Sequence, residues 1–395
     1  MPISTVTFQM NALAQMEALN EALARSQSEL ATGKKLQTAA DNPAAMAQVN
    51  ALNVQLSVSQ QGVTNGNAVR TSLQLEQNAL SSASNVLQSV REVALQANNS
   101  DLNPSERQSL AAQLQQLQQA LLAAANTRDG NGAYLFAGTA TTAQPFVQAG
   151  NAVSYLGTAA VNQVQISPDQ SLSVSDAGSS VFMNIPTGNG TFTTAVGPAN
   201  TGNASIDPGR VSNASAWVAD TYTIAFTSPT QYQVSNSSGT VVGSGSFQDG
   251  DSIAFNGVSV TLSGTPVAGD QFTIAPAGKA SAFATVSSLI ATLGSGNLSN
   301  AQLATQIGQA VQQLDSSLDR LNNVQAGVGS RLNAISDAAD SAQASQTTLQ
   351  TTVSQLTDVD YAAAVTKLST QELALQAAQE SYASIARLSL FNYLP

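Results

Sequence analysis

IGQAVQQLDSSLDRLNNVQAGVGSRLNAI, residues 307–335, carries an apolar residue at almost every third or fourth position. This spacing places the apolar side chains on one face of an α-helix, and a sustained seven-residue repeat is typical of helices that pack in a coiled-coil manner. The repeat continues to Leu356, and Gln325 and Gln346 are its polar members. We therefore expect one long helix packed on other helices. Its apolar positions are Ile307, Val311, Leu314, Leu318, Leu321, Val328, Leu332, Ile335, Ala339, Ala342, Leu349, Val353 and Leu356.

The first third of the chain predicts further helices of the same kind, because it contains little Gly or Pro. Apolar residues keep the same spacing over residues 69–97, interrupted at Glu76, and again over residues 110–124. The second run follows NPSER, residues 103–107, in which Asn103 is suited to cap a helix that begins at Pro104.

Both ends of the chain are also expected to be helical. The last helix follows TDVD, residues 357–360, where Asp358 or Asp360 can act as the cap, and the chain closes on the apolar stretch LSLFNYLP. These two helices have small or apolar residues around more than one face, so they cannot bury everything against each other. We therefore predict that other molecules cover them, whereas the repeats within residues 60–130 and 300–355 form an intramolecular core. The predicted assembly-interface residues are Val6, Met10, Leu13, Met16, Leu19, Leu23, Leu30, Leu368, Leu375, Tyr382, Ile385, Leu388, Leu390, Phe391, Tyr393 and Leu394.

The middle of the chain has a different composition. Gly, Thr, Ser and Val dominate residues 141–278, which contain seven Asp, one Arg and no Lys or Glu. Strand-like runs such as DTYTIAF and QYQVS alternate with turn sequences such as SSG and QDGD. This pattern predicts a compact all-β insert.

The expected fold is therefore a multidomain α+β protein. A long antiparallel coiled-coil-like helical bundle is formed by the N- and C-terminal segments, and an all-β domain is inserted between them. We expect terminal assembly helices at 1–35 and 358–395, a helical bundle domain at 36–140 and 280–357, and an outward-facing β domain at 141–279.

Composition excludes several classes of function. Charged residues make up 9% of the 395 residues, the formal net charge is −11, and there is neither Cys nor His. Nucleic-acid binding needs clustered Lys and Arg, so it is not expected. Without Cys or His we expect no metal, no cofactor and no enzymatic activity. No apolar run approaches about 18 residues and no cleavable signal pattern is present, so neither membrane insertion nor a cleaved signal peptide is expected.

Long motifs at both ends resemble proteins of the flagellin superfamily. SELATGKKLQTAADNPAAMAQ (28–48) resembles the segment after their first helix, and DVDYAAAVTKLSTQELALQAAQESYASIARLSLFNYL (358–394) resembles their C-terminal helix. NGAYLFAGTATTAQPF (131–146) and the ending LSLFNYL are more similar to the junction members of the superfamily, which join hook and filament, than to filament flagellin. QDGDSIAFNGVSVTLSGTPVAGDQFTI (248–274) resembles a β unit of hook-associated proteins.

The resemblance implies a structural subunit of the bacterial flagellum that acts as a junction adapter and self-assembles through its terminal helices. It implies an extracellular location, reached through the flagellar secretion apparatus without a cleaved signal peptide, and terminal helices that become ordered on assembly. The implied partners are neighbouring copies in a ring, another hook-associated protein on the hook side, flagellin on the filament side, and an export chaperone at the C-terminal helix.

Two other interpretations stay open. Filament flagellin would have the same helical scaffold, and the β insert could serve as an adhesin-like binding module with Trp217 as its platform. Trp217 lies within SAWVADTYTIAF, which is more typical of a core residue of the insert. DGD, residues 249–251, suggests calcium, but the Glu that closes an EF-hand loop is missing and the dipeptide DG favours a hairpin turn.

Overall fold

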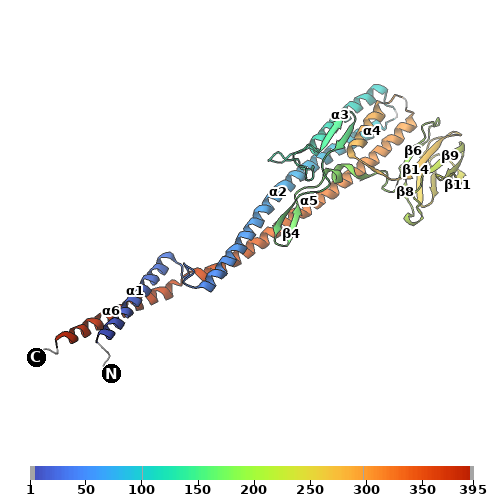
Figure 1. The fold of residues 1–395 in the computed structure, drawn as a ribbon. Helices are drawn as coiled ribbons and strands as arrows, with labels where there is room; N and C mark the ends of the chain where they lie inside the picture. Colours follow the sequence, from blue (N-terminus) through green and yellow to red (C-terminus); the bar gives the residue numbers. More distant parts are fainter. Residues whose placement is uncertain (1–4, 100, 297, 392–395) are drawn as a thin grey trace. The chain divides into compact units, whose positions relative to one another are not determined.

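The computed structural model describes residues 5–99, 101–296 and 298–391, and it describes the backbone alone at residues 5, 6, 8 and 385–391. The chain divides into two compact units (Figure 1). The terminal unit consists of residues 1–63 and 339–395, and the central unit of residues 64–338. We describe each unit separately.

Helices dominate both ends of the chain, as the repeats predict. Their bounds are α1 (Thr5–Thr32), α2 (Pro43–Ala97), α3 (Pro104–Ala125), α4 (Ala282–Gly294), α5 (Asn300–Thr357) and α6 (Tyr361–Phe391). The whole repeat from 307 to 356 therefore lies in α5, which confirms the expected long helix.

The strands lie between α3 and α4, and all their pairings are antiparallel. They are β1 (Phe146–Ala149), β2 (Ala152–Tyr155), β3 (Gln163–Ser167), β4 (Gln170–Ser173), β5 (Ile185–Pro186), β6 (Phe192–Val196), β7 (Ser205–Ile206), β8 (Arg210–Val211), β9 (Tyr222–Ser228), β10 (Gln231–Ser235), β11 (Val241–Ser246), β12 (Ser252–Phe255), β13 (Val258–Ser263), β14 (Gln271–Pro276) and β15 (Lys279–Ala280).

The start of α3 shows how the local sequence fixes a helix end. The Asn103 side chain accepts hydrogen bonds from the backbone N–H groups of Ser105 and Glu106, both at 3.0 Å, and Glu106 accepts the N–H of Asn103 at 2.8 Å. This reciprocal arrangement is a capping box, with Pro104 at the first helical position. The predicted cap is confirmed.

In the central unit, α2 and α5 run antiparallel. A side chain added at Gly66 would meet Ile335, whereas Arg91 forms an ion pair with Asp315, so the partner number falls as the number in α2 rises. The buried face of α5 in this unit includes five predicted repeat positions, which supports the interpretation of this repeat as an intramolecular core, and it also includes Ala301, Leu303, Thr305, Ala310, Gln313 and Ser317. The five repeat positions are Ile307, Leu314, Leu321, Val328 and Ile335.

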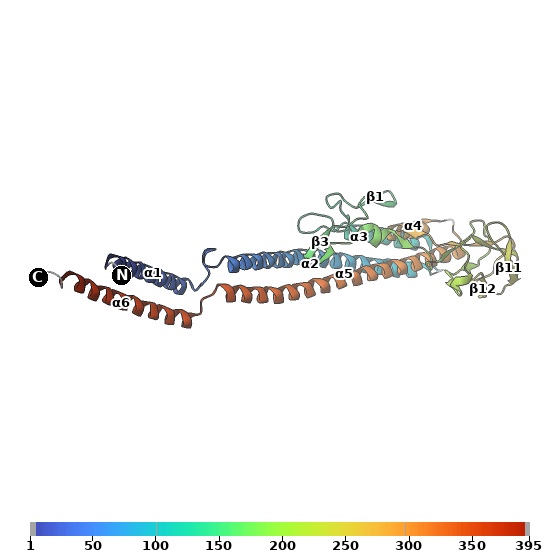
Figure 2. The ribbon, with the colours of Figure 1, turned by 60° about the horizontal axis from the view of Figure 1, so that its bottom comes forward.

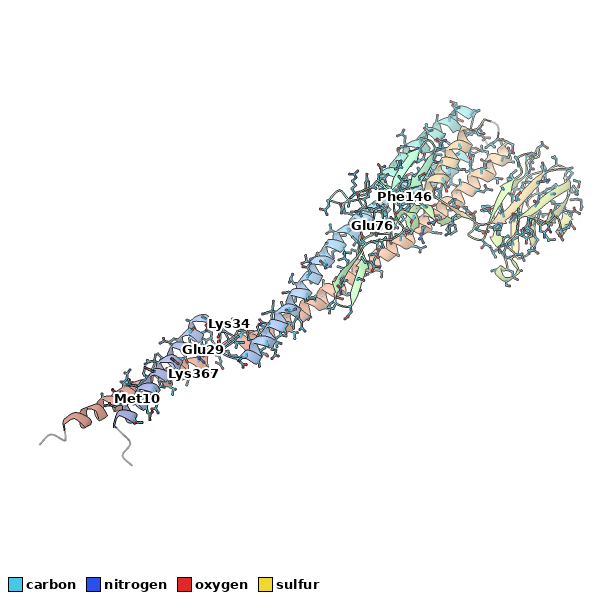
Figure 3. The ribbon with its side chains drawn as sticks, in the orientation of Figure 1. Met10, Glu29, Lys34, Glu76, Phe146 and Lys367 are labelled. Carbon is cyan, nitrogen blue, oxygen red and sulfur yellow. The ribbon has the colours of Figure 1, made fainter. Side chains whose placement is uncertain are left out.

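The stretch NGAYLFAGTATTAQPF joins the helices through an aromatic cluster (Figure 3). Phe146 is completely buried, and its ring lies 5.5 Å from that of Phe182 and 5.2 Å from that of Phe283, centroid to centroid. Gly178 packs so closely on this ring that an added Cβ would lie 2.6 Å from it. Residues 146–185, expected within the β insert, thus place their buried side chains in the helical core.

The β domain, residues 192–276, has a hydrophobic core of its own. One sheet has the strand order β11-β10-β9-β14-β6, and a smaller one has the order β12-β13-β7, with β8 also paired to β13. Trp217 is half-buried against this core, with its ring 5.7 Å from those of Phe192 and Tyr222. Trp217 thus packs at the edge of the core of the insert, which bears out the prediction in part.

Several Asp side chains of the β domain stabilise turns. Asp270 is buried and accepts hydrogen bonds from the backbone N–H groups of Thr201, Gly202 and Val267. Asp251 accepts the N–H of Gln248 at 2.8 Å, and the DGD stretch forms a turn. The turn is not the expected hairpin, because β11 and β12 on either side of it belong to different sheets. These contacts explain part of the Asp content of the insert, because a carboxylate satisfies the backbone donors that a turn leaves free.

We expect Phe146→Ala to lower the free energy of unfolding of the helical core by about 3–5 kcal/mol, because truncating a fully buried Phe leaves a cavity. Urea denaturation followed by far-UV circular dichroism measures this change. Leu156→Ala is the matched control, since Leu156 is 62% exposed, and should change the free energy by less than about 0.5 kcal/mol. Equal effects of the two substitutions would contradict the packing described here.

Candidate assembly interface

α1 and α6 lie side by side and antiparallel (Figures 1 and 2). The Ser26 hydroxyl donates to the Gln371 side chain at 2.7 Å, and Lys367 forms an ion pair with Glu29, with 3.8 Å between Nζ and Oε2. Figure 3 shows Glu29 and Lys367 at the same level of the pair. The pairing therefore joins residues from opposite ends of the chain.

The contact between α1 and α6 buries very little. Among the described side chains of these two helices, only Ser26 and Ala364 are buried. The half-buried residues recur every third or fourth position, as expected for the seam between two helices. The predicted interface residues on this seam are Met16, Leu19, Leu23, Leu30, Leu368, Leu375 and Tyr382, and all seven are half-buried.

A second set of apolar side chains points away from the seam. Met10 is 65% exposed and Leu13 is 46% exposed on α1, while Val365 and Leu373 on α6 are 51% and 69% exposed. Next to Val365 the surface has a shallow hollow lined by the small side chains Ala362, Ala363, Thr366 and Thr370 and by Lys367 and Gln371 of the seam. The predicted interface residues include Met10 and Leu13. They do not include the exposed Tyr361, Val365 and Leu373, because these three lie outside the apolar repeat of the last helix.

The remaining predicted interface residues lie near the chain ends. Val6, Ile385, Leu388, Leu390 and Phe391 belong to α1 or α6 by their backbone, and their side chains are not described. Tyr393 and Leu394 lie outside the described residues. The role of all sixteen residues in assembly therefore stays a prediction.

A short joint links this helix pair to α2 and α5 within the terminal unit. The backbone N–H of Lys35 donates to the carbonyl of Thr357 at 2.7 Å, and that of Val359 donates to the carbonyl of Gly33 at 2.9 Å. Gly33 has φ +71°, and a side chain there would also press on the hydroxyl of Tyr361. The joint is thus a small two-stranded contact between residues distant in sequence.

Asp358 fastens the joint, and Asp360 caps α6. The carboxylate of Asp358 pairs with the Lys34 ammonium and accepts hydrogen bonds from Ser354 and Thr357, whereas Asp360 accepts the N–H of Ala362 at 3.0 Å. The Lys34 contact, followed by the two hydroxyls, lowers the pKa of Asp358 to about 2 from 3.8. Of the two candidate caps, Asp360 caps α6, whereas Asp358 stabilises the joint.

The described residues offer little for chemistry or for a bilayer. No group of three or more acidic side chains in them is placed to hold a metal ion. None of the helices in the described ranges has the length and hydrophobicity that a membrane crossing requires.

We expect Asp358→Asn to speed trypsin cleavage after Lys34 and Lys35 a few-fold at neutral pH, because Lys34 loses its anionic partner while the half-exposed pair limits the effect. The pKa of Asp358 is lowered in the folded chain, so its stabilisation is complete above about pH 3.8 and is lost as the pH falls through about 2. Asp340→Asn removes the same charge from an exposed site on α5 and should leave cleavage unchanged. Identical rates for the two variants would refute the role of Asp358.

Family models match the two ends and the β domain. The bacterial flagellin N-terminal helical region matches residues 3–141, and the bacterial flagellin C-terminal helical region matches residues 311–394. The D2-like domain of flagellar hook-associated protein 1 matches residues 197–276, which include the β unit recognised in the sequence.

Relatives and solved structures place the chain more narrowly. Flagellar hook-associated protein 3 of Escherichia coli is 29% identical over 157 residues, 40% of this chain, and the match spans about half the length (49%) of that relative. The flagellar junction protein FlgL from Legionella pneumophila is 32% identical, with a TM-score of 0.71 over 79% of this chain and 100% of that one. FlgL of Xanthomonas campestris is 31% identical, with a TM-score of 0.71 over 77% of this chain and 99% of that one. The chain therefore belongs to the hook-associated protein 3 (FlgL) family of the flagellin superfamily, whose members are structural proteins of the bacterial flagellum, an extracellular appendage.

Proposed function

We propose that this chain is the adapter that joins the flagellar hook to the filament, and that it assembles through α1 and α6. The observation that carries the proposal is the pair of terminal helices, which buries only Ser26 and Ala364 among its described side chains and leaves Met10, Leu13 and Leu373 exposed. Exposed apolar groups on a helix pair mark an interaction surface. Membership of the FlgL family supports the proposal that the assembly is the junction between hook and filament.

The physical mechanism is folding coupled to assembly. Two helices of 28 and 31 residues with a half-buried seam gain little from pairing alone, since most helical stability in proteins comes from packing. Neighbouring copies would cover Met10, Leu13, Val365 and Leu373, and this burial offsets the entropy lost on ordering. The small side chains around Ala362 and Thr366 allow a neighbouring helix to approach closely.

The proposed partners are those that the resemblance to the flagellin superfamily implies. Copies of the chain would form a ring through heterologous contacts, with another hook-associated protein on the hook side and flagellin on the filament side. An export chaperone would cover the apolar face of α6 before secretion, and the chain would leave the cell through the flagellar secretion apparatus without losing a signal peptide. The terminal assembly helices would be residues 1–35 and 358–395, the bundle domain 36–140 and 280–357, and the outward β domain 141–279, in which residues 146–185 pack apolar side chains into the helical core. We propose that the chain has no catalytic activity.

Deleting the gene and imaging the appendages tests the function, with an assay of the medium for flagellin. Bare hooks together with shed flagellin are the expected result. Bare hooks with no other flagellin in the medium would instead identify this chain as the filament subunit. Normal filaments would refute the adapter role.

We expect the double substitution Met10→Glu and Leu13→Glu to block filament formation in such a deletion strain. An uncompensated buried charge costs about 3–5 kcal/mol, so assembly should weaken more than about a hundredfold. Glu is a good helix former, and circular dichroism should show an unchanged monomer. Filaments are counted by electron microscopy.

The control is Val218→Glu, which changes an apolar side chain of similar exposure (60%) in the β domain and should leave filament number unchanged. Wild-type filament number in the Met10/Leu13 variant would exclude this face of α1 from the interface.

A further inference from the structure

A buried glutamate lies in the central unit, and it takes no part in the candidate assembly interface. Glu76 sits in the middle of α2 with its side chain fully enclosed (Figure 3). Its Oε1 accepts the backbone N–H of Asp176 at 2.9 Å, whereas Oε2 receives no hydrogen bond from the described residues. A buried carboxylate with an unsatisfied oxygen is costly, so the side chain favours its neutral, protonated form.

The segment above Glu76, residues 163–178, is a strap laid over α2 and α5. It consists of the β3–β4 hairpin and the loop that follows it. Asn65 of α2 donates to the carbonyl of Gln165 at 2.9 Å, and Arg331 of α5 donates to the carbonyl of Ser173 at 3.4 Å. Ile166 is the buried apolar anchor of the strap in the helical core. Val164, Leu172 and Val174 of the strap are half-buried against the same core, so apolar packing holds the strap together with polar contacts that include the Glu76 carboxyl.

The charged groups that act on Glu76 come from both elements packed against it. Asp176 of the strap contributes a negative charge, and Arg331 of α5, which forms an ion pair with Asp176, contributes a positive one. Burial raises the pKa of Glu76 most strongly, and the charge of Asp176 raises it further. The hydrogen bond from the Asp176 N–H and the charge of Arg331 lower it, and the pKa is about 8.

We propose that Glu76 and the strap form a proton-dependent latch, in which the strap is held while the buried carboxyl keeps its proton and loosens as that proton is lost. On deprotonation the proton passes to solvent, and the new carboxylate is left beside Asp176 without enough donors. Lifting the strap brings water to Glu76 and relieves both the desolvation and the repulsion between the two carboxylates. This inference is independent of the assembly interface.

The direction of the pH effect follows from proton linkage. The closed strap binds the proton with a pKa of about 8, whereas an open strap exposes Glu76 with an ordinary pKa of 4.5. Between these two values the open form has lost the proton that the closed form keeps, so opening becomes more favourable as the pH rises. Above about pH 8 both forms are ionised, and the effect levels off.

Hydrogen exchange of the full chain, followed by mass spectrometry and corrected for intrinsic rates, tests the latch. Protection of residues 163–178 should fall about tenfold for each pH unit between about 5 and 8 and then become constant. Glu76→Gln carries no titrating proton and should show constant protection. Glu92→Gln is the matched control, because Glu92 is an exposed residue of the same helix, and it should keep the wild-type slope.

Constant protection of the wild-type strap, or the same fall in Glu76→Gln, would overturn the proposal. If Glu76→Gln fails to fold, the infrared spectrum of the wild-type chain shows whether Glu76 is protonated. A band from a protonated carboxyl should be present at neutral pH and vanish above about pH 8. Its absence at neutral pH would equally overturn the latch.

Discussion

Two helices that pack only on each other cannot enclose a hydrophobic core. α1 and α6 meet this limit directly, since Ser26 and Ala364 are their only buried side chains among those described, and the large apolar residues of the seam stay half-buried. The contacts at the base of the helix pair are accordingly polar rather than apolar. The joint around Lys34 and Asp358 secures the two helices by polar contacts, and apolar side chains such as Met10 and Leu373 stay exposed.

The central unit has the opposite character. Its helical core unites α2, α3, α4 and α5 with the aromatic cluster around Phe146, and its β domain has a separate core of aromatic and aliphatic side chains. The buried side chains of each core come from this chain alone. One chain thus combines a unit with enclosed cores and a helix pair with exposed apolar side chains, and this combination suits the proposed adapter.

The sequence predicts most of this architecture, because period and capping are local properties. The repeat through α5 and the Asn103 cap follow from residue spacing alone. The burial of Glu76 and the membership of residues 146–185 in the helical core depend on tertiary contacts, which spacing does not report. The exposed Leu373 was missed for a related reason, since the repeat identifies the seam and ignores the outer face. The hydroxyl contacts that lower the pKa of Asp358 likewise arise only once α5 has folded.

The most direct test compares hydrogen exchange in the chain purified alone with exchange in assembled appendages. If assembly orders the terminal helices, amides of residues 5–32 and 361–391 exchange almost without protection in the free chain and become strongly protected in the appendage. The cores of the central unit should be protected in both. Strong protection of α1 and α6 in the free chain would contradict the account, because the pair would then be stable without neighbours.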